Sequence, residues 1–220
     1  MNSMPGIAGE TNDFKTKWNL QIRQRLYGPQ RQGNLDGEYI DSSDGYVTDE
    51  LDLHRDHFAA AETPLVFSFG THRPAIFRGL IALEYIRPIA ADMHGTGKLM
   101  MANATPDRLC WLTPMLDVLG AETDCNPRGE WRPMDDAHLL YRRALCKGKP
   151  YCFLMNTAFE NFSHDLVARS MKRALAYGCF PGFFSHNASE GHYFTRPSDS
   201  RKNLNTYKTK TYAYTIVSIR

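Results

Sequence analysis

The chain has 220 residues, of which 42% are hydrophobic and 12% aromatic, so it can bury a sizeable core and is neither disordered nor fibrous. Its 26 basic and 24 acidic residues give a formal net charge of +2, which is nearly balanced. This balance argues against a nucleic-acid partner and against binding to an anionic membrane surface.

The spacing of cysteines and other candidate ligands predicts neither disulfides nor a bound ion. The five cysteines are odd in number and contain no Cys-x-x-Cys pair, which indicates reduced thiols. Neither a His-Glu-x-x-His motif nor a glycine-rich phosphate loop is found. We therefore expect no metal and no cofactor. The chain also lacks a signal-like start and an apolar run of about 18 residues, so by default it is expected to be cytoplasmic, with no membrane partner.

Residues 1–34 predict a loop followed by one amphipathic helix. Phe14, Trp18, Ile22 and Leu26 recur every four residues, and Asp13 is suited to cap the helix that they define. A strand is expected next, over residues 35–40, and it ends at Asp41.

Residues 44–76 form a long connection with a short apolar run, residues 64–69, that is typical of an extra strand. Connections of this length inside a domain are often lids or binding loops. We favour a lid that carries His54, Arg55 and His57, although a structural role is more common than ligand contact for polar residues in such a loop.

Further strands then alternate with helices. Strands are expected over residues 98–102, 118–121, 151–155 and 180–184, and helices over residues 77–94, 109–115, 135–145 and 164–177. All five strands end in polar side chains, which are Asp41, Asn103, Glu122, Asn156 and the group Ser185, His186 and Asn187.

This asymmetry predicts an α/β fold whose active site lies at the carboxyl ends of parallel strands. A (β/α)8 barrel has that arrangement, and a doubly wound sheet has a related one at its switch point. The missing phosphate loop makes the doubly wound sheet the weaker alternative.

Six segments of the chain resemble the C-terminal half of a TIM-barrel glycoside-hydrolase-like protein, from a bacterial group distantly related to retaining α-glycosidases. They are residues 35–42, 98–103, 116–123, 132–134, 149–156 and 178–187. The resemblance implies a partial (β/α)8 TIM barrel over residues 35–197, whose five parallel strands are the fourth to the eighth. The first three strands would then lie outside this chain, and the exposed barrel edge would offer a surface for association. Residues 198–220 form an extension with a strand-like alternation.

Glycosidic hydrolysis needs two carboxyl groups on either side of the bond that breaks. Asp41 and Glu122 are the acids that end two strands on one rim, and Asp44 or Asp124 could replace Glu122 in this role. The resemblance implies Asp41 as the nucleophile and Glu122 as the general acid/base.

Other polar and aromatic residues past the strand ends suit a carbohydrate substrate. Amide and imidazole groups can bond sugar hydroxyls, and aromatic rings can stack on sugar faces; the candidates are Asn103, Asn156, His186, Asn187, Trp131 and Tyr193. Trp111 has a helical spacing more typical of a core residue.

Three functions are therefore compatible with the sequence. The first is a retaining glycosidase, and the second is a catalytically silent barrel fragment that binds carbohydrate. The third is another TIM-barrel hydrolase or lyase, with a metal ion held among Asp41, Glu122 and His186.

Overall fold

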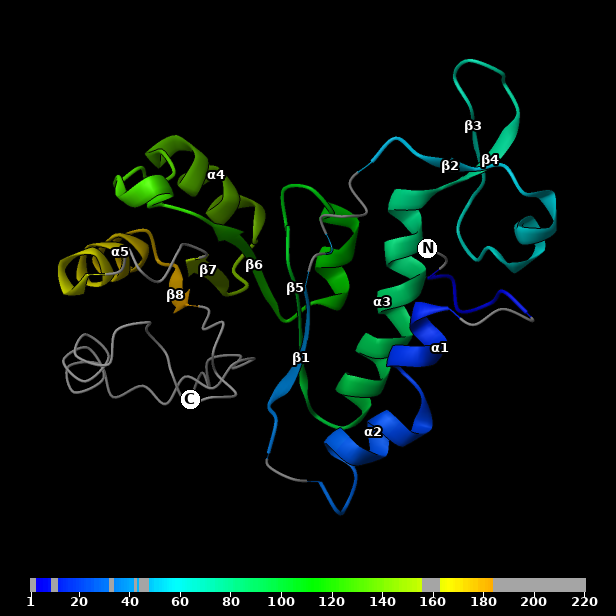
Figure 1. Cartoon of the computed structure of the whole chain (residues 1–220), viewed down its shortest axis with the longest axis horizontal. Coiled ribbons are helices and arrows are strands. Elements are labelled where there is room, and N and C mark those ends of the chain that lie inside the picture. Colours follow the sequence, from blue (N-terminus) through cyan, green and yellow to red (C-terminus); the bar gives the residue numbers. More distant parts are fainter. Residues whose placement is uncertain are drawn as a thin grey trace.

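The computed structural model describes residues 3–8, 12–31, 34–41, 43, 48–155 and 163–183. Its main sheet has five parallel strands, and their spatial order follows their order in the chain (Figure 1). The strands are β1 (Gly37–Ile40), β5 (Leu99–Ala102), β6 (Val118–Thr123), β7 (Tyr151–Met155) and β8 (Phe180–Phe183). The expected α/β architecture with five parallel strands is confirmed.

Helices connect the strands of this sheet, as the sequence predicts. They are α3 (Arg78–Gly95), the 3-10 helix η3 (Cys110–Met115), α4 (Asp136–Leu145) and α5 (His164–Ala176). Asp135 caps α4, because its carboxylate accepts a hydrogen bond of 2.9 Å from the backbone N–H of His138.

One face of the sheet packs against these helices. Strand residues such as Met100, Leu119 and Phe153 alternate toward that face and join side chains of α3, η3, α4 and α5 in the main core cluster. Alternation places Met101, Val118 and Cys152 on the opposite face, where they form a second buried cluster together with Tyr39, Leu99 and Leu154. The sheet is therefore apolar on both faces, as parallel sheets usually are.

Two glycines on the second face allow neighbouring strands to pack closely. A Cβ atom at Gly120 would lie 2.5 Å from the backbone oxygen of Cys152, and one at Gly182 would lie 2.3 Å from Cδ2 of Leu154. Side chains of the neighbouring strands occupy the space that a larger residue would need.

The N-terminal segment forms two short helices, so the prediction of one continuous helix is wrong. They are α1 (Asp13–Lys17) and α2 (Leu20–Tyr27). Asn12, not Asp13, caps α1, and the Asn19 side chain caps α2 by accepting a hydrogen bond of 3.0 Å from the N–H of Ile22. Asparagine competes well for backbone groups at helix starts, and here that outweighs the four-residue period.

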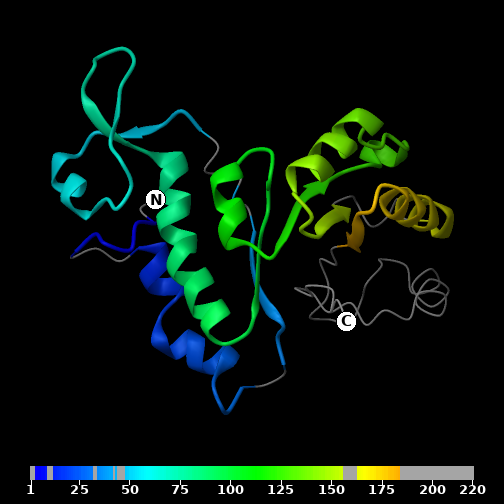
Figure 2. The same cartoon turned by 180° about the vertical axis from the view of Figure 1, so that it is seen from behind.

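The described part of the connection before α3 contains regular secondary structure, and its role as a lid stays a prediction. It contains an antiparallel sheet of β2 (Leu51–Asp52), β4 (Pro74–Phe77) and β3 (Val66–Phe67), and the 3-10 helix η2 (Arg55–Ala60). The extra strand expected within residues 64–69 is confirmed. Figures 1 and 2 show that this small sheet lies at the amino end of α3, on the side away from β8.

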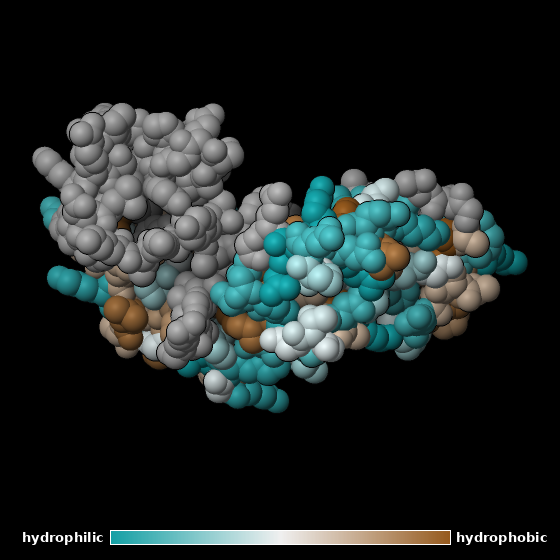
Figure 3. All heavy atoms as spheres, turned by 90° about the horizontal axis from the view of Figure 1, so that it is seen from below, coloured by the Kyte–Doolittle hydropathy of each residue, from teal (hydrophilic) through white to brown (hydrophobic). Residues whose placement is uncertain are grey.

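The described surface is mainly hydrophilic, with isolated apolar spots, in the view from below (Figure 3). Among the described helices, none has the length and apolar character needed to cross a bilayer. The strand-like alternation expected within residues 198–220 lies outside the described residues.

A buried glutamate ties the small-sheet region to α3. Glu84 is only 3% exposed, and its Oε1 accepts hydrogen bonds from the N–H groups of Glu62 and Thr63 and from the Thr63 hydroxyl. We expect Glu84→Ala to lower the free energy of unfolding by about 3 kcal/mol, because it leaves buried donors without an acceptor. Glu84→Gln keeps an acceptor oxygen and should cost about 1 kcal/mol. Urea unfolding would measure both, and equal losses would contradict this account.

Glu38 gives the stability of the fold a defined pH dependence. Burial raises the pKa of its carboxyl group, although a hydrogen bond from the Tyr27 hydroxyl opposes the shift. Between the ordinary pKa of glutamate, about 4.3, and the raised value, the folded state binds more protons than the unfolded state, so stability falls as pH rises.

Glu38→Gln removes this titration. We therefore expect the variant to gain stability relative to wild type as pH rises from about 4 to neutrality. Tyr27→Phe removes the hydrogen bond that limits the rise in the Glu38 pKa. Its stability should therefore fall more steeply with pH than that of wild type over the same range. Urea unfolding at several pH values would test both, and a constant difference between Glu38→Gln and wild type would be evidence against the assignment.

Candidate functional site

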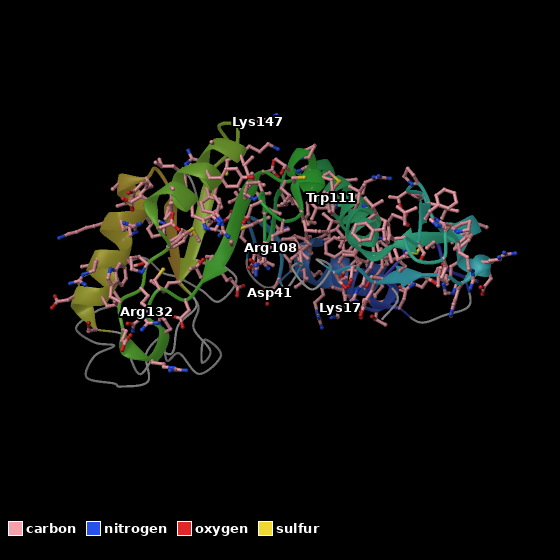
Figure 4. All side chains as sticks on the ribbon, turned by 90° about the horizontal axis from the view of Figure 1, so that it is seen from above. Lys17, Asp41, Arg108, Trp111, Arg132 and Lys147 are labelled. Atoms are coloured by element: carbon pink, nitrogen blue, oxygen red, sulfur yellow. The ribbon has the colours of Figure 1, made fainter. Side chains whose placement is uncertain are left out.

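The carboxyl ends of β1, β5 and β6 bring three predicted site residues to one rim of the main sheet. Asp41 follows β1, Asn103 follows β5, and Glu122 lies near the end of β6. Ile40 is paired with Ala102, so Asp41 and Asn103 leave their strands at equivalent positions. Figure 4 labels Asp41, which is exposed at this rim.

The Asn103 side chain joins the two carboxylate-bearing residues. Its Nδ2 donates to Oδ1 of Asp41 over 3.4 Å, and its Oδ1 accepts from the backbone N–H of Glu122 over 3.2 Å. Oδ1 also accepts from the N–H of Ala104 at 2.7 Å. Because Asn103 is only 6% exposed, an amide with both donor and acceptor satisfies buried groups that an apolar residue could not.

The turn after β5 holds Asn103 in this position. The Thr105 hydroxyl donates to the carbonyl oxygen of Ala102 at 2.8 Å, and the Thr105 N–H donates to that of Gly120 at 3.1 Å. The Ser43 hydroxyl, from the segment after β1, donates to the carbonyl oxygen of Asn103. The turn is therefore bonded to β6 and to the segment that follows β1.

Tyr39 is a site residue that the sequence analysis missed. It lies on the second face of the sheet, and its hydroxyl donates a 2.8 Å hydrogen bond to Oε1 of Glu122. Burial raises the pKa of this phenol, and the negative charges of Glu122 and Asp41 raise it further. Tyr39 is therefore a neutral hydrogen-bond donor that orients the Glu122 carboxylate. Tyr39 lies two residues before Asp41, and alternate residues of a strand point to the same face. This spacing was the feature of the sequence that could have indicated Tyr39.

Trp131 does not join this group. It follows the 3-10 helix η4 (Pro127–Gly129), packs partly against the main core cluster, and has the Arg169 guanidinium 5.6 Å from its ring centroid. Its neighbour Arg132 is well separated from Asp41 in Figure 4. Trp111, also labelled there, packs against the main cluster, as its helical spacing indicated.

The remaining predicted residues divide into two groups. Asp124, considered as a substitute for Glu122, accepts a 2.8 Å hydrogen bond from the N–H of Asn126 and so closes a local turn. Five others lie outside the described residues, and they are Asp44, Asn156, His186, Asn187 and Tyr193.

Comparison of the chain with protein-family models, with curated proteins and with solved structures finds no match. The geometry of the rim is therefore the basis for any functional assignment.

The rim offers two carboxylates with different surroundings. Asp41 is exposed and hydrogen-bonded to an amide, whereas Glu122 is partly buried and hydrogen-bonded to a phenol. Such a pair can act on a substrate placed between them, with one group exchanging a proton and the other acting as a base or nucleophile.

We expect Asn103→Ala to lower the free energy of unfolding by about 2 kcal/mol, because the buried N–H groups of Ala104 and Glu122 lose their acceptor. Urea unfolding would measure the loss. The exposed amide Asn34 provides a control, and Asn34→Ala should change stability by less than about 0.5 kcal/mol. Equal effects of the two substitutions would mean that the Asn103 contacts contribute little.

Proposed function

We propose that this chain is part of a glycoside-hydrolase-like barrel that hydrolyses O-glycosidic bonds by a two-carboxylate retaining mechanism. The observation that carries the proposal is the single buried amide of Asn103, which contacts both Asp41 and the backbone of Glu122. Two acids from different strands are thereby held at one rim, which is the arrangement that this chemistry needs.

Three features of the main sheet support a (β/α)8 barrel as its architecture. Its parallel strands are arranged in chain order, without the reversal that marks a doubly wound sheet. The described helices that connect the strands pack on one face, as they do around a barrel. The other face carries apolar and small side chains, which suit the packed interior of a barrel.

In the proposed mechanism, Glu122 gives a proton to the glycosidic oxygen while Asp41 attacks the anomeric carbon. The bond to the leaving alcohol breaks, and a glycosyl ester forms on Asp41. Glu122 then takes a proton from water, whose oxygen attacks the anomeric carbon, and the bond to the Asp41 carboxylate breaks to release the sugar. Tyr39 is a positioning residue in this scheme, because it holds one oxygen of the Glu122 carboxylate.

The proposed substrate contacts extend beyond the carboxylates. Asn103 lies at the rim and can bond a sugar hydroxyl in exchange for its long contact with Asp41. We propose the same role for Asn156, His186 and Asn187, and ring stacking for Tyr193. The Arg169 contact makes Trp131 the weaker candidate for stacking.

Aryl glycosides with leaving groups of different acidity test the two roles separately. We expect Asp41→Asn to lower kcat/KM by about 10²–10⁴-fold for every substrate, because it removes the nucleophile. Glu122→Gln should slow poor leaving groups strongly and good ones little, because only poor leaving groups need a proton. The first product should keep the anomeric configuration of the substrate, as NMR spectroscopy would show.

Asp36→Asn is the matched control. Asp36 is an exposed carboxylate at the amino end of β1, whereas Asp41 and the rim lie at the carboxyl end. It should retain wild-type activity. Glycosidase activity that survives both Asp41→Asn and Glu122→Gln would overturn the proposal. Sugar binding without hydrolysis would instead assign a binding fragment, and activity abolished by a chelator would assign a metal-dependent enzyme.

A further inference from the structure

A second cluster of ionisable side chains lies in the small-sheet region, apart from the rim. It consists of Asp52 at the end of β2, His54 just before η2, and His57 within η2. One side-chain ligand atom of each residue lies within 4.8 Å of those of the other two. In Figures 1 and 2, β2 and the segment that follows it lie across α3 from β6, β7 and β8.

The local backbone brings the two imidazoles together. In a 3-10 helix, residues three apart lie directly above one another, and His54 and His57 have this spacing at the start of η2. The N–H of His57 donates to the carbonyl oxygen of His54 at 3.1 Å, and the ring centroids are 5.0 Å apart.

Asp52 is bonded to both histidines. The N–H of His54 donates to Oδ1 of Asp52 at 2.9 Å, and Nδ1 of His57 lies 2.7 Å from Oδ2. Partial burial would raise the pKa of the Asp52 carboxyl, but the bonds and charges of the two histidines outweigh it, so the pKa lies below its usual value.

Packing beneath the cluster makes it a built site rather than three loose surface residues. Asp52 is paired in the small sheet with Ile76, which is 1% exposed, and Phe58 of η2 packs against the same apolar cluster as Ile76. The side chains of His57 and Asp52 are themselves only 15% and 26% exposed. The donor atoms are therefore held close together before any ligand binds.

We infer that Asp52, His54 and His57 form a binding site for a divalent transition-metal ion of the zinc class. Two imidazoles and one carboxylate are a donor set that zinc uses in proteins, with water in a fourth position. Imidazole donors also favour such ions over Mg²⁺ and Ca²⁺, which prefer oxygen ligands. The inference does not rest on the proposed glycosidase activity.

The distance between His57 and Asp52 must change slightly when a metal ion binds. Two ligands of a tetrahedral zinc ion are about 3.3 Å apart for bonds of 2.0–2.1 Å, so the 2.7 Å contact between His57 and Asp52 must open slightly. The proton that they share is released when the metal takes its place. His57 also lines a surface hollow of about 420 Å³, together with Gly6, Asp56 and Ala60, which leaves room beside its ring for a further small ligand.

Titration with Zn²⁺ against a chromophoric chelator tests the site on the whole chain. His54→Ala is the principal variant, because the exposed His54 side chain can be removed with little risk to the fold. Loss of a direct ligand should weaken binding at this site by at least about tenfold, since loss of even an outer-shell partner costs 10–100-fold. His57→Gln and Asp52→Asn should have the same effect.

His138→Ala is the matched control. His138 is also exposed, and its Nδ1 lies 3.8 Å from a carboxylate oxygen of Asp135. Within the described part of the chain, however, His138 does not belong to a cluster of three groups that could hold a metal ion. This variant should bind Zn²⁺ as wild type does.

Substitution with Co²⁺ gives a second readout, because tetrahedral coordination produces a strong visible absorption. We expect that absorption in wild type and in His138→Ala, and we expect it to be lost in His54→Ala. Wild-type zinc stoichiometry and affinity in both His54→Ala and His57→Gln would overturn the inference, and so would a wild-type chain that binds no Zn²⁺.

Discussion

The structure depends on one constraint, which is that the parallel strands of the main sheet follow one another in chain order. Connections between parallel strands almost always have the same hand, so successive steps in one direction place every connecting helix on the same face. The main core cluster forms there, between α3, η3, α4, α5 and the strands. The same constraint gathers the strand ends at one rim, so residues far apart in the sequence meet.

The two proposed sites are built in different ways. At the rim, Asp41 and Glu122 are 81 positions apart in the sequence and depend on the whole sheet and on Asn103 for their placement. At the small sheet, Asp52, His54 and His57 lie within six positions and depend on one turn of 3-10 helix. Loss of sheet order would therefore disperse the first group, whereas the second needs only its local apolar support.

Much of the fold could be predicted because the strands of the main sheet are short apolar runs with polar ends. Such runs predicted all five strands, and β7 has the predicted bounds. The same pattern predicted that Asp41 and Asn103 each follow a strand, and the structure adds the hydrogen bond between them. Side-chain competition at a single residue was harder to predict, as Asn19 shows by starting a second helix. Tyr39 and Asp52 were missed, and so was the close approach of Asp52 to His54 and His57, because these contacts depend on register and on a 3-10 turn, which leave little trace in hydrophobic periodicity.

The close packing at Gly120 links the interior of the sheet to its rim. Glu122 lies two residues further along β6 and on the same face, and its backbone is bonded to Asn103. A methyl group at position 120 would press on the Cys152 backbone and on the end of Met101, so β6 would have to move away from one of its neighbours. Such a movement would change the position of the Glu122 carboxylate relative to Tyr39 and Asp41. A substitution in the apolar interior could therefore disturb the arrangement of Asp41 and Glu122 without replacing either residue.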